Sequence, residues 1–312
     1  MAAIQERDSS ISDKTSNGST AVLRISLRWP IVTSLVLLGI ALFFKWVDTF
    51  ALRLDERLGE IILCKTLGFA MVVAFVWAAG RSLRDIGLHS RHLALSLLLG
   101  SGITAAALVV GYGAEFVLQL ESEPEFRLAA IDPKAGVTGG ILFVLWMLLG
   151  NAINSFMEEG LFRGVMIRLF RVRLSFWWAN LMQAFLFGLW HLPWVLKWYQ
   201  VGELEAHGGL LFAALSQFLP MLLIGFVWGI FYLRTDSLWV PWIAHCLNNT
   251  VFNLVHIGTA SGLDSGPALR GPVSLIVSML GMFVVKYAAD RFQMPEVKPW
   301  GEWTRYDLGT EG

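Results

Sequence analysis

The sequence Asn-Ser-Phe-Met-Glu-Glu-Gly-Leu-Phe-Arg, residues 154–163, places three ionisable side chains inside a long apolar run. These side chains are Glu158, Glu159 and Arg163, and the run around them covers about residues 138–169. An ionised side chain at the centre of a bilayer costs at least about 2.5 kcal/mol. Charges in such a run therefore indicate a function, and the run itself predicts a helix that crosses a membrane.

The composition of the whole chain also indicates a membrane protein. Of its 312 residues, 55% are apolar and 15% are charged, whereas soluble domains are about 45–50% apolar and about 25% charged. Only helices and closed barrels satisfy their backbone groups in lipid. The apolar runs are continuous rather than alternating, which favours helices. The expected fold is an all-α, polytopic transmembrane helix bundle of about eight spans.

Eight runs supply the roughly 20 mostly apolar residues that a spanning helix needs. They cover about residues 29–47, 60–80, 92–118, 138–169, 177–198, 209–233, 238–257 and 268–289. The chain is thus divided into a disordered cytoplasmic tail at 1–28, a transmembrane bundle at 29–291 and a polar C-terminal tail at 292–312. The formal net charge of zero argues against a nucleic-acid partner.

Arginine and lysine gather in alternate loops of the predicted bundle, and the loops between them are acidic or balanced. The basic residues are Arg24, Arg28, Arg81, Arg84, Arg91, Arg168, Arg171, Arg173, Arg234, Lys286, Arg291 and Lys298. Cytoplasmic loops of membrane proteins carry such an excess of positive charge. An integral multi-pass membrane protein with both termini in the cytoplasm is therefore expected.

The two adjacent glutamates are expected to have different functions. Glu159 and Arg163 are four residues apart with the acid first, which is the favourable order for an ion pair on a helix. Glu158 points about 100° away from Glu159. It therefore lacks that cation, and it must find a partner on another helix or take up a proton. The alternative is that the whole group is an ion-pair staple between helices.

Two other runs carry polar side chains at the same four-residue spacing. Phe187 and His191 lie in one run, and His245 and Asn249 lie in the other. Counted from the basic loops at about 1.5 Å per residue, Glu158, His191 and His245 reach a similar depth in the membrane. A carboxylate assisted by a histidine can deprotonate water, and imidazole and amide donors can stabilise an oxyanion. This set suits hydrolysis of an acyl or peptide bond, although structural hydrogen bonds between helices are an alternative.

The same groups offer ligands for a metal ion. Glu158, His191 and His245 would be the candidates, as in zinc hydrolases. The chain has no His-Glu-x-x-His zinc motif. No cofactor is therefore predicted with certainty, and a divalent metal such as zinc is the alternative. Lys45 and Asp48, near the end of the first run, are expected at the membrane interface.

Three motifs in this order, each on its own predicted helix, resemble those of the CPBP family. They are Glu158-Glu159-x-x-x-Arg163, Phe187-x-x-x-His191 and His245-x-x-x-Asn249. The family contains the CAAX prenyl endopeptidases and bacteriocin-processing or bacteriocin-immunity membrane proteins. The resemblance covers about residues 138–257, and the segment Arg84-Asp85-Ile86-Gly87-Leu88 before the third run is also similar to the family.

The resemblance implies an eight-helix bundle that cuts a peptide bond of a membrane-embedded or lipidated substrate, for example a prenylated one. It implies that Glu158 and His191 activate water and that His245 and Asn249 form the oxyanion site. The supporting residues would be Glu159, Arg163 and Phe187. The family has been called a metalloprotease family, but the resemblance favours a glutamate-driven reaction without metal.

Two other functions fit the same residues. A non-catalytic membrane adaptor or bacteriocin-immunity protein would bind a toxin or a partner enzyme, and it would keep this function without Glu158 or His191. A proton-coupled transporter would use Glu158 and His191 as a relay, but the sequence has no visible inverted repeat of the kind that transporters carry. The endopeptidase is the leading hypothesis, and the sequence does not identify its substrate.

Overall fold

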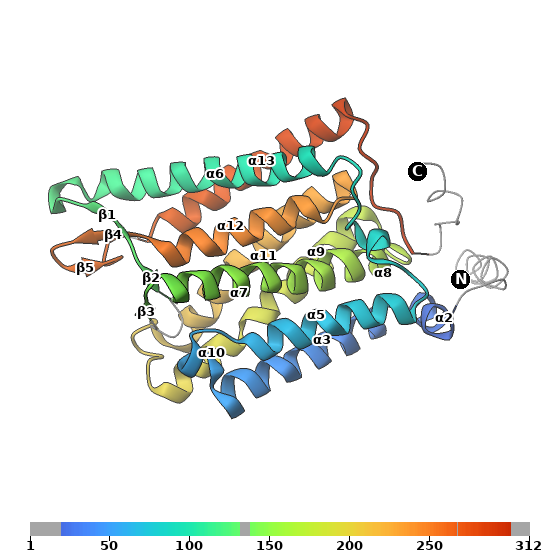
Figure 1. Ribbon diagram of the computed structural model, residues 1–312, viewed down its shortest axis with the longest axis horizontal. Helices are drawn as coiled ribbons and strands as arrows, with labels where there is room; N and C mark the ends of the chain where they lie inside the picture. Colours follow the sequence, from blue (N-terminus) through green and yellow to red (C-terminus); the bar gives the residue numbers. More distant parts are fainter. Residues whose placement is uncertain (1–19, 132–137, 267, 301–312) are drawn as a thin grey trace.

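A computed structural model describes residues 20–131, 138–266 and 268–300 of the chain, which form one bundle of long helices (Figure 1). In chain order the helices are α2 Ala21–Arg28, α3 Pro30–Trp46, α4 Leu54–Leu58, α5 Ile62–Ala78, α6 Leu93–Leu118, α7 Ile141–Glu159, α8 Arg168–Arg171, α9 Phe176–His191, α10 Pro193–Val201, α11 Gly209–Thr235, α12 Trp239–Leu254 and α13 Arg270–Arg291. The π-helical segments η1 Val47–Leu52 and η4 Gly160–Ile167 continue α3 and α7, and η2 Leu83–Ile86 and η3 Leu120–Ser122 are short 3-10 turns.

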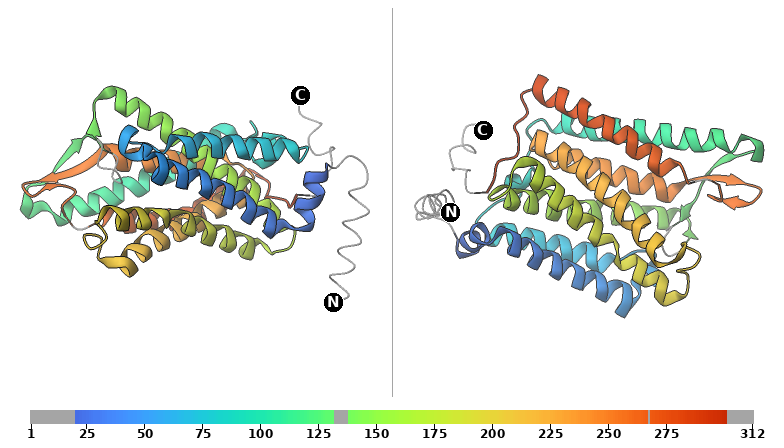
Figure 2. Two further views of the ribbon diagram at one scale, coloured as in Figure 1. Left: turned by 90° about the horizontal axis from the view of Figure 1, so that it is seen from below. Right: turned by 180° about the vertical axis from the view of Figure 1, so that it is seen from behind.

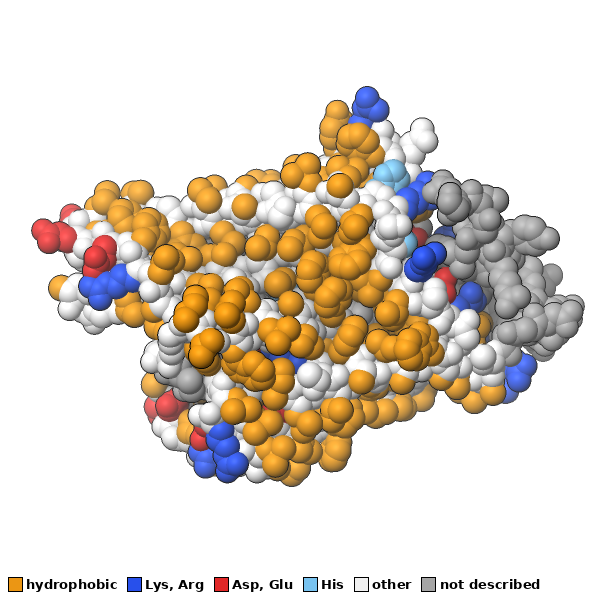
Figure 3. Space-filling model, in the orientation of Figure 1, with side chains coloured by type: hydrophobic (Ala, Val, Ile, Leu, Met, Phe, Trp, Pro, Cys, Tyr) orange, Lys and Arg blue, Asp and Glu red, His pale blue; other side chains and the backbone are white. Residues whose placement is uncertain are grey.

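All eight predicted runs contain a helix, and the all-α, polytopic bundle is confirmed. Within the described residues, five stretches are long and apolar enough to cross a membrane. They are Pro30–Leu52, Leu93–Leu118, Ile141–Arg171, Gly209–Thr235 and Arg270–Arg291. In the other three runs α5 has 17 residues and α9 and α12 have 16 each, so the expected total of eight spans stays a prediction. Apolar side chains cover the middle of the face shown in Figure 3, and most charged side chains lie toward its ends.

The long helices run along one axis of the molecule, as the three ribbon views show (Figure 2). α11 packs against α9 and α13, α12 packs against α6 and α7, and α5 packs against α3 and α7. α7 and α12 therefore lie next to each other in the bundle, although four other helices separate them along the chain. This contact brings together two of the three motifs.

Short strands extend one end of the bundle. β1 Glu125–Leu128, β4 Val255–Thr259 and β5 Gly262–Leu263 form an antiparallel sheet, in which Glu125 pairs with Gly258. β2 Ala130–Ile131 and β3 Thr138–Gly139 form a second, two-stranded sheet. The sequence did not predict these strands, because β4 begins inside the last residues of the apolar run that was assigned to one helix.

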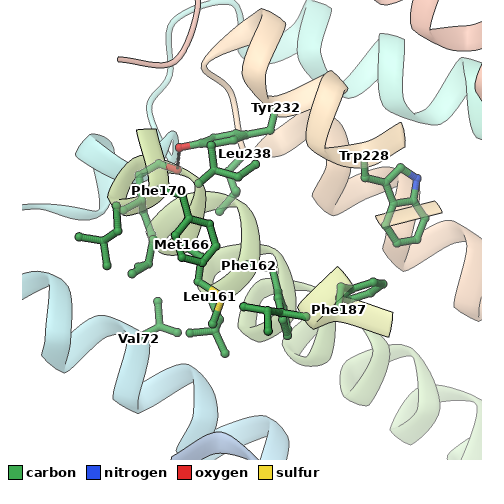
Figure 4. Close-up of a cluster of buried hydrophobic side chains, with 14 of the residues drawn as sticks. Val72, Leu161, Phe162, Met166, Phe170, Phe187, Trp228, Tyr232 and Leu238 are labelled. Carbon is green, nitrogen blue, oxygen red and sulfur yellow. Dashed lines mark hydrogen bonds between the residues drawn. The ribbon is translucent and has the colours of Figure 1, made fainter. Parts of the chain in front are cut away.

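Segment η4 lies in the centre of the hydrophobic core, and all eight of its residues are buried. Figure 4 shows its side chains gathered between Val72 of α5 and Tyr232 of α11. A Cβ atom on Gly164 would lie 3.0 Å from the Cβ atom of Ile86, so glycine permits the close contact with η2. π-Helical turns within α-helices occur often at functional sites, and η4 begins directly after Glu159.

The last residues of the expected N-terminal tail form a helix and are not disordered, and part of the expected C-terminal tail contacts the bundle. Residues Ala21–Arg28 form a helix whose N-cap is Thr20, and the hydroxyl of Thr20 accepts a hydrogen bond from the Leu23 amide at 3.1 Å, as N-cap residues do. At the other end, the Val297 amide donates to the Leu233 carbonyl, and the Trp300 ring stacks on Phe75. The chain up to residue 300 therefore packs against the bundle. The rest of the two expected tails lies outside the described residues.

Candidate active site

The predicted ion pair between Glu159 and Arg163 is present, and both side chains are 0% exposed. Arg163 Nη1 lies 3.0 Å from Glu159 Oε1. Arg163 also donates from Nη2 to the carbonyl of Gly225 on α11, and its guanidinium lies 4.3 Å from the centre of the Phe187 ring. A fully buried ion pair needs such additional partners, because its desolvation penalty is large. Phe187 thus supports the ion pair, because its ring packs against the guanidinium of Arg163.

His245 reaches the same carboxylate from α12. Its Nδ1 lies 2.8 Å from Glu159 Oε1, so this oxygen binds both Arg163 and His245. An ionised carboxylate only accepts hydrogen bonds, which places a hydrogen on Nδ1 and leaves Nε2 directed at the neighbouring glutamate. His245 Nε2 lies 3.8 Å from Glu158 Oε2. This separation is too long for a direct hydrogen bond and allows a water molecule to contact both atoms.

The two oxygens of the Glu158 carboxylate have different surroundings. Oε1 accepts a hydrogen bond from the indole Nε1 of Trp190 at 3.0 Å. Oε2 is buried and has no hydrogen-bond partner among the described residues. The expectation that Glu158 needs a partner on another helix therefore holds, and that partner is a tryptophan on α9. A buried acceptor without a partner is unfavourable and is suited to receive a proton during a reaction.

His191 lies near Glu158, and Asn249 lies on the same helix as His245. His191, at the end of α9, donates from Nδ1 to the Phe187 carbonyl at 2.9 Å, because a carbonyl can only accept. It is close enough to Glu158 for their charges to interact. Asn249 is half-buried on α12, four residues beyond His245, and therefore on the same helix face. The ring of Phe187 contacts both histidine rings edge to face, with centroid distances of 4.8 Å to His191 and 6.3 Å to His245.

Lys45 and Asp48, which were expected at a membrane interface, are both buried inside the helix bundle. Lys45 is 2% exposed and donates from Nζ to the Trp190 carbonyl at 2.7 Å. Asp48 is 0% exposed and accepts a hydrogen bond from the Cys64 amide at 2.7 Å. The sequence did contain a signal for Lys45, because an ionisable residue inside an apolar run is in itself a candidate for function.

The buried charges of the site balance one another. Glu158 and Glu159 carry two negative charges when ionised, and Arg163 and Lys45 carry two positive charges. Lys45 is within electrostatic range of Glu158, and Arg163 is paired with Glu159. An uncompensated buried charge is strongly unfavourable. Because each carboxylate has a cation available, both carboxylates can remain ionised.

A buried polar face of α7 continues from Glu158 toward the other end of the helix. Asn151 and Asn154 lie seven and four residues before Glu158 and are buried, and this spacing places them on the same side of the helix. Asn151 donates to the hydroxyl of Thr250 on α12 at 3.3 Å. Asn154 Oδ1 has no partner among the described residues. Sequence reasoning missed both asparagines, although their helical spacing from Glu158 was a usable signal.

The candidate metal ligands do not fit a zinc site. Within the described part of the chain, no three or more His, Cys, Asp and Glu side chains are grouped so that they could hold a metal ion. A catalytic zinc ion needs three protein ligands at about 2.0–2.2 Å, which Glu158, His191 and His245 do not supply in this arrangement.

Two polar residues of α9 fix the acceptor that holds Arg163. Gln183 donates from Nε2 to the Gly225 carbonyl at 2.9 Å, and the same carbonyl accepts from Arg163 at 3.2 Å. Gln183 also donates to Asn180 Oδ1 at 2.8 Å. As a single polar residue in an apolar run, Gln183 forms no pattern in the sequence, and only the packing of α9 on α11 shows its use.

The same contact between α9 and α11 predicts a strong sensitivity at Gly229. A Cβ atom there would lie 1.8 Å from Asn180 Oδ1 and 2.6 Å from Gln183 Nε2. We expect Gly229→Ala to lower the free energy of unfolding by about 1–3 kcal/mol, because the crowded helices must separate. Thermal unfolding of the purified protein in detergent measures the effect. In the control Gly102→Ala a Cβ atom meets nothing within 4 Å, and stability is expected to hold or to rise by up to about 1 kcal/mol. Equal unfolding temperatures for the two variants would contradict this packing.

Comparison with known proteins tests the resemblance that the sequence suggested. No curated protein matches the chain. Residues 140–251 match the family described as type II CAAX prenyl endopeptidase Rce1-like. The match begins directly before α7, ends within α12 and includes all three motifs, so the resemblance seen in the sequence is confirmed. Segment 140–251 of the chain is thus similar to the Rce1-like type II CAAX prenyl endopeptidase family.

Proposed function

We propose that the protein is an intramembrane endopeptidase that hydrolyses a peptide bond of a membrane-associated, CAAX-type substrate. The observation that carries this proposal is the meeting of Glu158, Glu159 and His245 in the buried contact between α7 and α12. It occurs within the segment that matches an endopeptidase family. The unpartnered Oε2 of Glu158 lies 3.8 Å from a histidine nitrogen, which is an arrangement suited to the activation of water.

In the proposed reaction, Glu158 Oε2 removes a proton from a water molecule, and the water oxygen attacks the carbonyl carbon of the scissile peptide bond. His191 assists this proton transfer. In the tetrahedral intermediate the C–N bond breaks, and the proton held by Glu158 passes to the leaving amine. The products are a carboxylic acid and an amine, and Glu158 is again a carboxylate.

The developing oxyanion needs donors, and α12 supplies them in this proposal. The side-chain amide of Asn249 donates one hydrogen bond. His245 donates the other from Nε2, which requires a second proton on a ring whose Nδ1–H already faces Glu159. Glu159 stabilises that imidazolium and fixes its orientation, as a carboxylate does for histidine in other hydrolases. Arg163 holds Glu159 in place through the buried ion pair.

The position of the site along α7 favours access from the side where the chain ends are expected. Glu158 lies ten residues before Arg168, a separation of at most about 15 Å, because most of the residues between them form the π-helical segment η4. Arg168 contacts the Lys298 carbonyl in the C-terminal segment, at the end of the bundle that also carries α2 (Figure 1). With both termini in the cytoplasm, as the loop charges predict, the substrate would enter from the cytoplasmic leaflet, where a lipid anchor can hold its peptide.

Proteoliposomes that contain the purified protein test the proposed activity. An internally quenched peptide with a prenylated C-terminal CAAX sequence should become fluorescent, and mass spectrometry should identify a single cleaved bond. The same peptide without the prenyl group is the matched control, because its local concentration at the membrane is lower. Absence of any cleavage with both peptides, and with a set of lipidated and unlipidated membrane peptides, would leave the non-catalytic adaptor as the better explanation.

Removal of metal ions should not change this activity. We expect dialysis against a strong chelator to leave the cleavage rate within about twofold of the untreated protein, because protein side chains alone make up the proposed proton path. Inductively coupled plasma mass spectrometry of the dialysed protein provides the control for metal removal. A loss of activity that added zinc restores would assign the reaction to a metal centre and would contradict the proposal.

A further inference from the structure

The carboxylate proposed as the base is held by a residue outside the three motifs. Trp190 Nε1 donates to Glu158 Oε1 at 3.0 Å, and Glu158 Oε2 is left without a partner among the described residues. We infer that Trp190 is a positioning residue for Glu158 and that Lys45 strengthens the effect of Trp190. This inference rests on the proposed function. The indole N–H fixes one carboxylate oxygen, and the other oxygen is thereby presented to the reacting water.

The hydrogen bond of Trp190 differs in kind from those of other tryptophans in the bundle. Trp146, Trp239 and Trp242 donate from their indole nitrogens to backbone carbonyls. Trp190 donates to a carboxylate, and hydrogen bonds to an ionised acceptor are roughly twice as strong as neutral ones. The Trp190 side chain is 1% exposed, and its ring lies against Phe162. Close packing on all sides keeps the N–H in one direction.

Lys45 places a positive charge on the face of the same ring. Its Nζ lies 4.2 Å from the centre of the Trp190 ring and donates to the Trp190 carbonyl at 2.7 Å. A cation over an indole face attracts π electrons, which makes the N–H at the ring edge a stronger donor to Glu158. Lys45 thus acts on Glu158 in two ways, through its charge across the site and through the polarised ring.

Lys45 also explains how the site joins the rest of the bundle. It lies on α3, far in the sequence from the family-matched segment 140–251. A buried lysine without compensation is expensive, and Arg163 already pairs with Glu159. The positive charge of Lys45 therefore compensates the negative charge of Glu158. Helix α3 thus contributes to the site although none of the three motifs lies on it.

Fixing Oε1 matters because the carboxylate torsion of a glutamate is soft. Without the indole N–H, the carboxylate plane of Glu158 can turn, and Oε2 no longer keeps its place 3.8 Å from His245 Nε2. A displacement of about 1 Å in a catalytic group can cost about 100-fold in rate. Substrate binding does not depend on this torsion. The expected loss is therefore in kcat and not in KM.

The variant Trp190→Phe tests the inference, because phenylalanine keeps an aromatic face for Lys45 and removes the N–H. We expect kcat to fall at least about tenfold while KM stays within about twofold. The matched control is Trp239→Phe, which removes an indole N–H that donates to the His89 carbonyl, and its kcat should equal that of the wild type. Retention of full kcat in folded Trp190→Phe would overturn the positioning role.

The variant Lys45→Met separates the contribution of Lys45 from that of Trp190. Methionine keeps most of the volume and removes the charge, and we expect a smaller fall in kcat than in Trp190→Phe. The double variant should lose less kcat than the product of the two single losses, because part of the effect of Lys45 passes through the Trp190 ring. Independent, multiplied losses would show that Lys45 does not work through the ring.

A spectroscopic measurement keeps this inference separate from the proposed function. In protein labelled with 15N at the indole nitrogens, the resonance that disappears in Trp190→Phe belongs to Trp190. We expect its proton shift to be displaced downfield and to return toward the value of a neutral hydrogen bond in Glu158→Gln and Lys45→Met. An indole shift that is the same in Glu158→Gln would disprove the contact. If Glu158→Gln kept full activity while its Trp190 indole shift returned as expected, the contact between Trp190 and Glu158 would stand, and the proposed function alone would be overturned.

Discussion

Glu158→Gln is expected to lower kcat by about 10²–10⁴-fold, which is the contribution of a general base. The carboxylate oxygen Oε2 of Glu158 is buried without a partner among the described residues and is available for a proton. A glutamine cannot take that proton. Its amide oxygen can still accept the Trp190 N–H that Glu158 Oε1 accepts at 3.0 Å, so the fold should be kept. Initial rates of peptide cleavage in proteoliposomes measure the effect.

The exposed Glu121, which follows α6 at the β-sheet end of the bundle, provides the matched control. Glu121→Gln makes the same chemical change outside the site and should leave kcat and KM as in the wild type. The unfolding temperature of Glu158→Gln should fall, because the buried Lys45 loses the carboxylate that balances its charge, so rates are compared at a temperature at which both proteins are folded. A folded Glu158→Gln variant that cleaves the peptide at the full rate would remove Glu158 from the mechanism.

The spacing of residues along single helices was the part of the site that sequence alone could predict. Glu159 and Arg163 are four residues apart, and the expected ion pair is present. Helix periodicity also separated the roles of the two glutamates, because it placed Glu158 on another side of α7. These predictions need no tertiary information, since they depend only on one helix.

Contacts between helices were beyond the reach of the sequence. The resemblance assigns His245 to the oxyanion site together with Asn249, but it does not imply that Nδ1 of His245 binds Glu159. The four-residue spacing shows which face of α12 is polar and leaves open how this face is rotated against α7. The burial of Lys45 was not predicted for a similar reason. Its depth was judged from its position near the end of an apolar run, whereas its burial depends on the packing of α3 against Trp190 of α9.

The prediction of how many helices cross the membrane is limited by another physical property, the length of the shorter helices. The helices α9 and α12 have 16 residues each, and both carry residues of the proposed site, His191 on α9 and His245 on α12. A helix of that length measures about 24 Å, which is less than the roughly 30 Å of a bilayer core. A short helix can remain inside a bundle when neighbouring helices cover its ends. Hydropathy along the sequence therefore finds these helices but does not decide whether they cross the bilayer.

Arg163→Met should have the largest effect on stability, with a loss of about 3–5 kcal/mol in the free energy of unfolding. The ion pair with Glu159 is 0% exposed on both sides. Removal of the guanidinium leaves a carboxylate in the core with His245 as its remaining partner. It also removes the hydrogen bond to the Gly225 carbonyl and the contact with the Phe187 ring. Unfolding of the purified protein in a denaturing detergent, followed by circular dichroism, measures the loss.

The double variant Glu159→Gln with Arg163→Met decides why stability is lost. If the penalty comes from the uncompensated carboxylate, removal of both charges should restore at least about half of the lost free energy, because buried ion pairs are often replaced by neutral groups at little net cost. Activity should not return with it, since the His245 ring would lose the ionised partner at 2.8 Å that holds it in the proposed oxyanion site. A double variant as unstable as Arg163→Met would show instead that packing around the guanidinium, and not its charge, stabilises the centre of the bundle. Recovery of stability without recovery of kcat would separate the structural function of the ion pair from its function in positioning His245.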